Sequence, residues 1–172
     1  MRVVAGELRG RKILAPEGNT TRPTTDMARE AIFNALTSLN AIVDARVLDL
    51  FAGSGALGIE ALSRGAKHCT FIERDRDALK TLQDNIKKLG LDDRTTVIRG
   101  DASIAAAKVA DIDLVMVDPP YEYRDWQGLL TNITAPLVVA ESNREINGIQ
   151  GWESVRSKRY GRTHVTYLRQ IP

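Results

Sequence analysis

The residues with the most distinctive chemistry are Asp118 to Tyr121, which read Asp-Pro-Pro-Tyr directly after an apolar run. Two consecutive prolines donate no backbone hydrogen bond and hold the chain stiff, so the Asp118 carboxylate and the Pro119 carbonyl remain available as acceptors. Paired acceptors suit an amino group on an aromatic ring, because they hold its two N–H groups while an electrophile approaches out of the plane. Tyr121 adds a ring face for a flipped base. The motif therefore indicates chemistry at an exocyclic amine.

A second candidate site is the glycine-rich turn within RVLDLFAGSGALG, residues 46–58. Gly53, Gly55 and Gly58 have the spacing G-x-G-x-x-G, in which missing side chains permit a tight turn, close approach of a ligand and close helix packing. This spacing alone is a weak signal, because it also occurs in structural strand-to-helix turns and does not separate NAD from S-adenosylmethionine. Together with the Asp-Pro-Pro-Tyr motif it predicts a nucleotide-type pocket.

Four acidic residues stand at the ends of successive predicted strands: Asp49, Glu73, Asp101 and Asp118. Ligands of doubly wound sheets bind beyond the carboxyl ends of the strands, so these side chains are expected to share one crevice. Glu73 follows Gly53 by 20 residues, which is the separation expected of a carboxylate that binds ribose hydroxyls. Asp101 could accept a hydrogen bond from an adenine amine, and Asp49 could receive the amino end of a methionine moiety.

Neighbouring residues complete the expected cofactor pocket. Ala102 would offer its backbone N–H beside Asp101, and Phe51 and Arg74 are assigned to the same pocket because each lies within two residues of one of the acids. The alternative for Asp101 and Glu73 is an ordinary helix N-cap or loop acid.

The elements that must position these residues alternate in type along the chain. Such alternation predicts an α/β fold with a doubly wound, mostly parallel sheet of seven strands, in which the last two form an antiparallel hairpin. Glycines and a capping threonine mark several helix ends. The predicted strands are Val47–Phe51, Cys69–Ile72, Thr96–Arg99, Leu114–Val117, Pro136–Ala140, Trp152–Tyr160 and Thr163–Arg169, and the predicted helices are Met27–Leu39, Ala56–Arg64, Asp77–Leu89, Ala102–Val109 and one within Trp126–Ile133.

The predicted organisation is one domain over residues 1–172, with a basic N-terminal extension (1–20) on a catalytic core (21–172). Short apolar and basic groups around two glycines predict two short strands or a hairpin within residues 2–14. Trp152 and Tyr160 are expected to pack the C-terminal hairpin rather than touch a ligand. Cys69 lies in an apolar run and is expected to be a core residue.

Composition indicates a globular protein without a membrane span: 43% of the 172 residues are hydrophobic and 27% are charged. The N-terminus lacks the apolar core of a signal peptide, so we expect a cytoplasmic location. Residues 1–29 carry six Arg or Lys against three acids, and residues 152–172 carry five against one. Two basic ends around an acidic middle predict a polyanion gripped by the ends, although solvated surface charge is the alternative.

The motifs resemble those of class I S-adenosylmethionine-dependent methyltransferases that modify exocyclic amines. More narrowly, nearly the whole chain resembles the bacterial small-subunit (16S) ribosomal RNA guanine-N2 methyltransferases. The segments that carry this resemblance are RVVAGELRGRKI, RPTTDMAREAIFNAL, DLFAGSGALGIEALSRGA, DPPY and RYGRTHVTYLR. The segment between Tyr121 and Pro136 departs from the family pattern, since it is short and carries Glu122 and Asp125.

The resemblance implies a Rossmann-like methyltransferase fold and in-line transfer of a methyl group to the N2 amine of a guanine in 16S ribosomal RNA, either free or within the assembled small subunit. It implies that Gly53, Gly55, Glu73 and Asp101 bind S-adenosylmethionine, that residues 118–121 hold the amine, and that Arg22 to Thr24 close over the methionine end. Arg9, Arg11 and Lys12 are expected to contact the RNA. We expect a monomer without a metal, with His68 and His164 in structural or surface positions.

Three other functions remain open at this point. An adenine-N6 methyltransferase acting on DNA or RNA would use the same Asp-Pro-Pro-Tyr chemistry, but no segment resembles a domain that reads DNA sequence. A nicotinamide-dependent dehydrogenase would use the glycine turn and leave the Asp-Pro-Pro-Tyr motif unexplained. A non-enzymatic RNA-binding module would explain the basic ends and leave the four acids unused.

Overall fold

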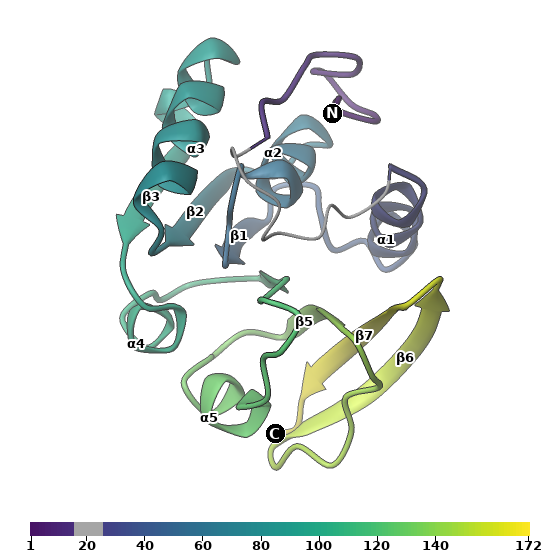
Figure 1. The fold of residues 1–172 in the computed structure, drawn as a ribbon. Coiled ribbons are helices and arrows are strands. Elements are labelled where there is room, and N and C mark those ends of the chain that lie inside the picture. The colour runs from purple at the N-terminus through teal and green to yellow at the C-terminus, as the bar shows by residue number, and fades with distance from the viewer. Residues whose placement is uncertain (16–25) are drawn as a thin grey trace.

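A seven-stranded sheet forms the centre of the protein in the computed structural model, which describes residues 1–15 and 26–172 (Figure 1). The strand order is β3-β2-β1-β4-β5-β7-β6. The first five strands are parallel, β7 is antiparallel to β5, and β6 is antiparallel to β7. The strands are β1 (Arg46–Leu50), β2 (His68–Glu73), β3 (Thr95–Arg99), β4 (Leu114–Val117), β5 (Leu137–Ser142), β6 (Trp152–Tyr160) and β7 (Thr163–Gln170). The predicted fold class, including the antiparallel C-terminal hairpin, is confirmed.

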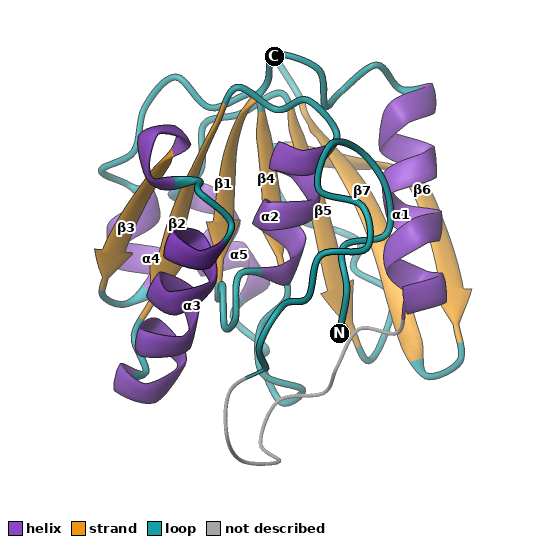
Figure 2. Cartoon of the chain, turned by 90° about the horizontal axis from the view of Figure 1, so that it is seen from above, coloured by secondary structure: helices purple, strands orange, loops and turns teal. Residues whose placement is uncertain are grey.

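Helices cover both faces of this sheet (Figure 2). One face carries α1, α2 and α3, and the other carries α4 and α5. Their bounds are α1 (Asp26–Ser38), α2 (Ala56–Ser63), α3 (Arg76–Lys88), α4 (Ala102–Ala106) and α5 (Trp126–Thr131), with a short 3-10 helix at Asp92–Arg94. Thus α4 is shorter than predicted. Within the described ranges, no helix is both long and apolar enough to cross a membrane.

Strand β1 lies inside the sheet, next to the point where the strand order reverses. Its apolar residues alternate between the two faces, so that Val47 packs in the core under α1–α3 and Leu48 in the core over α4 and α5. Burial on both faces accounts for the near-continuous apolar run in the sequence. From β1 the chain winds to β2 and β3 on one side, and then from β4 to β5 on the other. The strand order therefore reverses between β1 and β4, where doubly wound sheets bind ligands.

The N-terminal segment forms a short, irregular antiparallel hairpin, as predicted. Arg2 and Lys12 form an isolated antiparallel bridge, and the Val3 and Ile13 N–H groups donate to the carbonyls of Arg11 and Met1 at 2.9 and 2.8 Å. In the turn, the backbone N–H groups of Glu7 and Leu8 donate to the carbonyl and hydroxyl oxygens of Ser63, both at 2.9 Å. These contacts fix the turn of the hairpin on α2.

Trp152 and Tyr160 both pack into the protein, as predicted. The Trp152 indole is buried and donates through Nε1 to the Leu130 carbonyl at 3.3 Å, and Tyr160 packs half-buried against the core under α1. Cys69 is a buried free thiol on β2. The predictions of packing roles for these three side chains are confirmed.

Candidate active site

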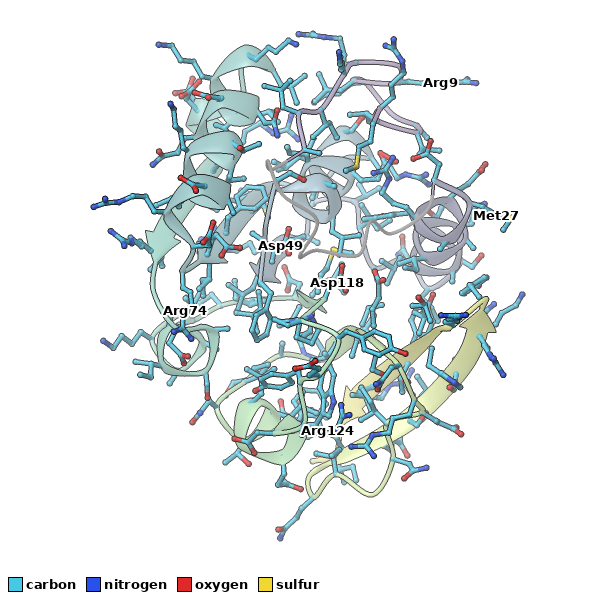
Figure 3. The ribbon with its side chains drawn as sticks, viewed as in Figure 1. Arg9, Met27, Asp49, Arg74, Asp118 and Arg124 are labelled. Atoms are coloured by element: carbon cyan, nitrogen blue, oxygen red, sulfur yellow. The ribbon has the colours of Figure 1, made fainter. Side chains whose placement is uncertain are left out.

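Two acids meet at the switch point between β1 and β4. Asp49 lies on β1 and is 1% exposed, and Asp118 follows the last residue of β4. Figure 3 shows both side chains near the centre of the molecule. The Asp49 Oδ2 accepts a hydrogen bond from the Gly58 N–H at 3.0 Å, at the beginning of α2. The two predicted site residues are therefore brought together on the face of the sheet that α2 covers.

The surroundings of Asp49 are acidic. Burial raises the pKa of Asp49 well above its ordinary value, the charges of Asp118 and Glu73 raise it further, and the hydrogen bond from Gly58 opposes them. Three carboxyl groups from three strand ends thus lie close enough to repel one another. A bound cation would relieve this repulsion.

The glycine turn combines an open position with two tightly packed ones. Gly53 has a φ of 57°, and a Cβ built there would meet nothing within 4 Å. By contrast, a Cβ on Gly55 would overlap Leu82, and one on Gly58 would overlap Phe71 and Cys69 of β2. Gly58 therefore permits close packing of α2 on the sheet, while Gly53 leaves the backbone open to an approaching ligand.

Glu73 is hydrogen-bonded to this turn, 20 positions after Gly53 in the sequence. Its Oε2 accepts from the Gly53 N–H at 2.7 Å, and its Oε1 accepts from the N–H groups of Arg74 and Asp75 at 2.9 and 2.8 Å. The predicted spacing therefore brings the carboxylate to the first glycine of the turn. Three backbone donors fix its orientation at the end of β2.

Asp101 has the helix-capping geometry that the sequence left open as an alternative. It is the N-cap of α4, and its Oδ1 accepts from the Ile104 N–H at 3.1 Å. The residue is exposed, and Ala102 behind it is buried. Arg74 is exposed near α4 (Figure 3). Arg22 and Thr24, which were expected to close the pocket, lie outside the described residues.

Tyr123 is a candidate site residue that the sequence did not reveal. Its ring makes edge contacts with Phe51 and Trp126, with centroid distances of 5.3 and 5.4 Å. Burial raises the pKa of Tyr123, and the charges of Asp125 and Asp101 raise it further. The ring therefore links the loop after Asp-Pro-Pro-Tyr to the loop after β1, where Phe51 has a φ of 57°. No sequence motif or periodicity signals a contact between two such distant loop residues.

The basic N-terminal residues do not reach this crevice. Arg11 donates through Nη2 to the Lys88 carbonyl at 3.2 Å, at the end of α3. The backbone of Lys12 forms an antiparallel β-bridge with that of Arg2. Arg9 lies at the margin of the molecule, far from Asp118 (Figure 3). Their predicted contact with RNA remains a prediction.

Other ionisable groups give no sign of a metal centre. Across residues 1–15 and 26–172, no group of three or more His, Cys, Asp or Glu side chains is arranged to hold a metal ion. His68 lies on β2 with its Nε2 2.9 Å from the Thr96 hydroxyl, and His164 lies half-buried on β7.

Comparison with known proteins identifies the relatives of this chain. It matches the family described as Conserved hypothetical protein 95 over residues 1–169. The chain belongs to this family. It is 39% identical to the Bacillus subtilis protein named "Putative rRNA methyltransferase YlbH" over 99% of both chains. It is also 45% identical to the Escherichia coli protein named "Ribosomal RNA small subunit methyltransferase D", over 70% of this chain and 60% of that protein.

Solved structures of similar proteins share the fold. The Escherichia coli protein described as "Putative methyltransferase yhhF" is 35% identical, covers 99% of this chain and 97% of its own, and superposes with a TM-score of 0.87. A Streptococcus agalactiae protein of the NADB-Rossmann superfamily, 16% identical with a TM-score of 0.70 over 88% of this chain and 71% of its own, supports the fold alone. The sheet is therefore a Rossmann-like methyltransferase sheet.

Proposed function

We propose that this protein transfers a methyl group from S-adenosylmethionine to the exocyclic N2 amine of a guanine in 16S ribosomal RNA, free or within the small subunit. The observation that carries the proposal is the position of Asp118-Pro119-Pro120-Tyr121, directly beyond β4 at the switch point and beside the buried Asp49. The names of the relatives, which are ribosomal RNA methyltransferases, support the same reaction class.

The residues around the crevice fit an adenosyl cofactor. Gly53 is open to an approaching ligand, and the carboxyl groups of Asp49, Glu73 and Asp118 favour a cationic one. When bound, S-adenosylmethionine supplies an electrophilic methyl group on a positively charged sulfur. We assign the ribose to Glu73 and the adenine to Asp101. The other proposed cofactor residues are Arg22, Thr24, Asp49, Phe51, Gly53, Gly55, Arg74, Ala102 and Asp118.

The target amine would be held by acceptors rather than deprotonated by a base before transfer. The Asp118 carboxylate and the Pro119 carbonyl would accept hydrogen bonds from its two N–H groups and so orient the nitrogen lone pair towards the methyl group. As the N–C bond forms, the S–C bond would break and leave S-adenosylhomocysteine, and the methylated amine would then release one proton to water. Tyr121, 51% exposed, offers its ring to the flipped base. Catalysis then comes mainly from positioning, which contributes up to about 7–11 kcal/mol in well-oriented systems.

Transfer of labelled methyl tests this function. Wild type and Asp118→Ala are compared on small-subunit ribosomal RNA, small-subunit particles and duplex DNA, with the exposed Asp84→Ala of α3 as the control. We expect N2-methylguanine in RNA or particles, a loss of about 10²-fold or more in Asp118→Ala, and wild-type activity in the control. Label in DNA adenine, or cofactor binding without transfer to RNA, would overturn the assignment.

The N-terminal basic residues and the assembly state complete the proposal. We assign Arg9, Arg11 and Lys12 to the RNA-contacting surface, so reversal of these charges should weaken RNA binding and its salt dependence; an unchanged affinity would exclude them. Residues 1–172 would act as one domain, in a cytoplasmic monomer. Gel filtration of the protein with light scattering checks the monomer.

A further inference from the structure

The β6–β7 hairpin carries an unbalanced positive charge. After Glu153 no acidic residue occurs in the sequence, and residues 154–172 contain five Arg or Lys. Lys158 and Arg159 directly precede Tyr160, the last residue of β6, and Arg162 lies in the two-residue turn that Tyr160 and Thr163 close. These three cations form what is called here the hairpin tip: Lys158, Arg159 and Arg162.

The pairing register places the hairpin tip at the same edge of the sheet as the proposed site. Val117, the last residue of β4, pairs with Ala140 of β5, which pairs with Thr166 of β7, which pairs with Ser157 of β6. Lys158 is therefore level with Asp118, and the turn extends beyond it. Figure 2 shows β6 pointing the same way as the parallel strands. Two strands separate β4 from β6, so the sideways distance is roughly 14 Å at about 4.8 Å per strand.

The side chains of β6 are mostly exposed, and two of those at the hairpin tip make contacts that orient them. Every residue of β6 between Trp152 and Tyr160 is exposed, although β6 belongs to the sheet. The Lys158 Nζ lies 5.4 Å from the centroid of the Tyr160 ring, and Arg159 Nε donates to the Gly161 carbonyl at 2.7 Å. Side chains held in this way lose less conformational freedom when they bind an anion.

We propose that the hairpin tip binds phosphates of the substrate RNA beside the target base; this inference rests on the proposed function. When the target base is flipped out to Asp118, the RNA strand that carries it runs along the edge of the sheet where β4 ends. At that edge the hairpin tip offers three positively charged side chains and no carboxylate. Phosphate contacts of this kind set the register of a nucleic acid on a protein. They would also offset the cost of extruding the base. Arg9 and Arg11 do not lie at this edge of the sheet, because they are beside the C-terminal ends of α2 and α3.

The test compares two double charge reversals of equal size in the full chain. Lys158→Glu with Arg162→Glu changes the hairpin tip, and Lys67→Glu with Lys108→Glu changes two exposed lysines away from it. RNA binding is measured by filter retention of a small-subunit RNA fragment at several salt concentrations. Cofactor affinity, and KM and kcat of methyl transfer, are measured in parallel.

For the tip variant we expect about tenfold or greater loss of RNA affinity and a salt slope shallower by roughly 1.4, since each lost phosphate contact of a single strand contributes about 0.7. KM for RNA should rise while kcat and cofactor affinity stay unchanged, and the control should match wild type. Equal losses in both variants, or no loss in the tip variant, would overturn the proposal. If wild type binds RNA through the tip but methylates none of it, the surface stands and the proposed function fails.

Discussion

Asp49 determines the charge balance of the crevice, because it is buried and faces two other carboxyl groups. A folded-state pKa above the unfolded one means that the native protein holds the proton more tightly. The protonated Asp49 therefore stabilises the folded protein at low pH, and this stabilisation is lost as the pH rises through the raised pKa. An ionised Asp49 is therefore a cost in stability that a cationic ligand would relieve.

We predict that Asp49→Asn is more stable than wild type at neutral and alkaline pH, and that the difference disappears towards acid pH. The asparagine cannot ionise, while its amide oxygen can still accept from Gly58. Thermal unfolding between about pH 4 and 9 measures this, and each kcal/mol gained raises Tm by about 2–4 °C. The exposed Asp84→Asn is the control. A stability difference that shrinks as pH rises would contradict the prediction, and cofactor affinity should fall in the variant.

Tyr123 provides a second prediction for a single side chain. Tyr123→Ala removes both edge contacts, each worth about 0.5–1.5 kcal/mol, and loosens the loop after Asp-Pro-Pro-Tyr from Phe51. We expect roughly tenfold weaker binding of S-adenosylmethionine, measured by isothermal titration calorimetry, because the ring supports Phe51, which is assigned to the cofactor pocket. Tyr123→Phe keeps the ring and should retain most of the affinity. If both variants bind the cofactor as wild type does, Tyr123 only packs the loop.

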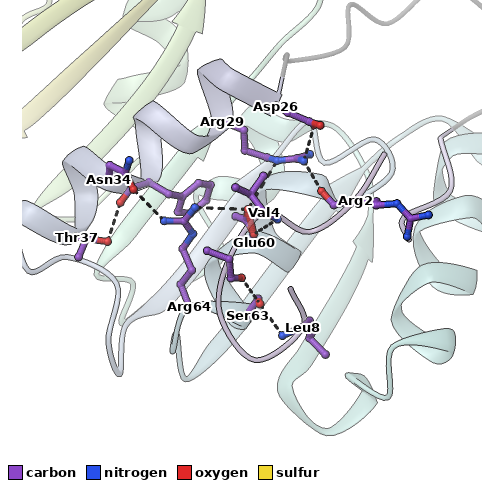
Figure 4. A network of polar contacts seen from close by, with 12 residues as sticks. Arg2, Val4, Leu8, Asp26, Arg29, Asn34, Thr37, Glu60, Ser63 and Arg64 are labelled. Carbon is purple, nitrogen blue, oxygen red and sulfur yellow. Dashed lines mark hydrogen bonds and ion pairs between the residues drawn. The ribbon is translucent and has the colours of Figure 1, made fainter. Parts of the chain in front are cut away.

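Among the elements, the N-terminal segment and α1 are joined to α2 by a buried polar network (Figure 4). Glu60 of α2 is fully buried and accepts from the Val4 N–H at 2.9 and 3.2 Å through its two oxygens. Arg29 of α1 and Arg64 lie 3.9 and 3.7 Å from the same carboxylate. Arg29 Nη2 also donates to the Arg2 carbonyl. A single carboxylate thus joins three parts of the chain.

We predict that Glu60→Ala destabilises the protein by about 1–3 kcal/mol, since the Val4 N–H loses its acceptor and the buried Arg29 keeps only the exposed Asp26 as a carboxylate partner, at 2.9 Å. Urea unfolding measures the change, and Glu30→Ala on the exposed face of α1 is the control, expected within about 0.5 kcal/mol of wild type. Glu60→Gln keeps the shape and one acceptor, so it should lose less than the alanine variant. If Glu60→Ala lowers the free energy of unfolding by less than about 1 kcal/mol, water replaces the carboxylate as the partner of the arginines.

The same segment is also connected to the glycine turn, which relates its packing to the site. Asn85 of α3 is fully buried, accepts from the Leu14 N–H, and donates to the carbonyls of Leu14 and Ser54, each at 2.9 Å. Ser54 lies between the first two glycines of the turn. Loss of the N-terminal segment would therefore leave the turn without one of its fixed neighbours.

At the scale of the whole molecule, periodicity predicted the sheet well because the parallel strands β1, β2, β4 and β5 are buried on both faces. The run Leu114–Val117 is fully buried and was predicted with its observed bounds, and the residues after each strand end were predicted to gather at one edge. The 20-residue separation of Gly53 and Glu73 likewise gave a contact that the structure contains. Patterns of this kind are local or follow from the regular winding of the fold.

Contacts between irregular segments could not be predicted in the same way. The packing of Tyr123 on Phe51 joins two loops, and the hydrogen bonds from Glu7 and Leu8 to Ser63 fix the N-terminal turn on a helix. Neither produces a repeat in the sequence. Charge counting indicated that both chain ends could grip a polyanion, but only the pairing register shows that the C-terminal end lies level with Asp118.

The arrangement of the whole molecule predicts that salt affects RNA binding and not chemistry. The proposed transfer site is central and lined by carboxylates, while the basic residues assigned to RNA lie on the hairpin tip and the N-terminal segment. Raising salt from about 50 to 200 mM should therefore raise KM for RNA severalfold or more, and leave kcat at saturating RNA and the Kd of S-adenosylmethionine within about twofold. Steady-state methyl transfer and calorimetry across that range measure both quantities. A fall of kcat in parallel with RNA affinity would show that phosphate contacts are needed to assemble the transfer site itself. The RNA-binding residues and the transfer site would then not act independently, contrary to this prediction.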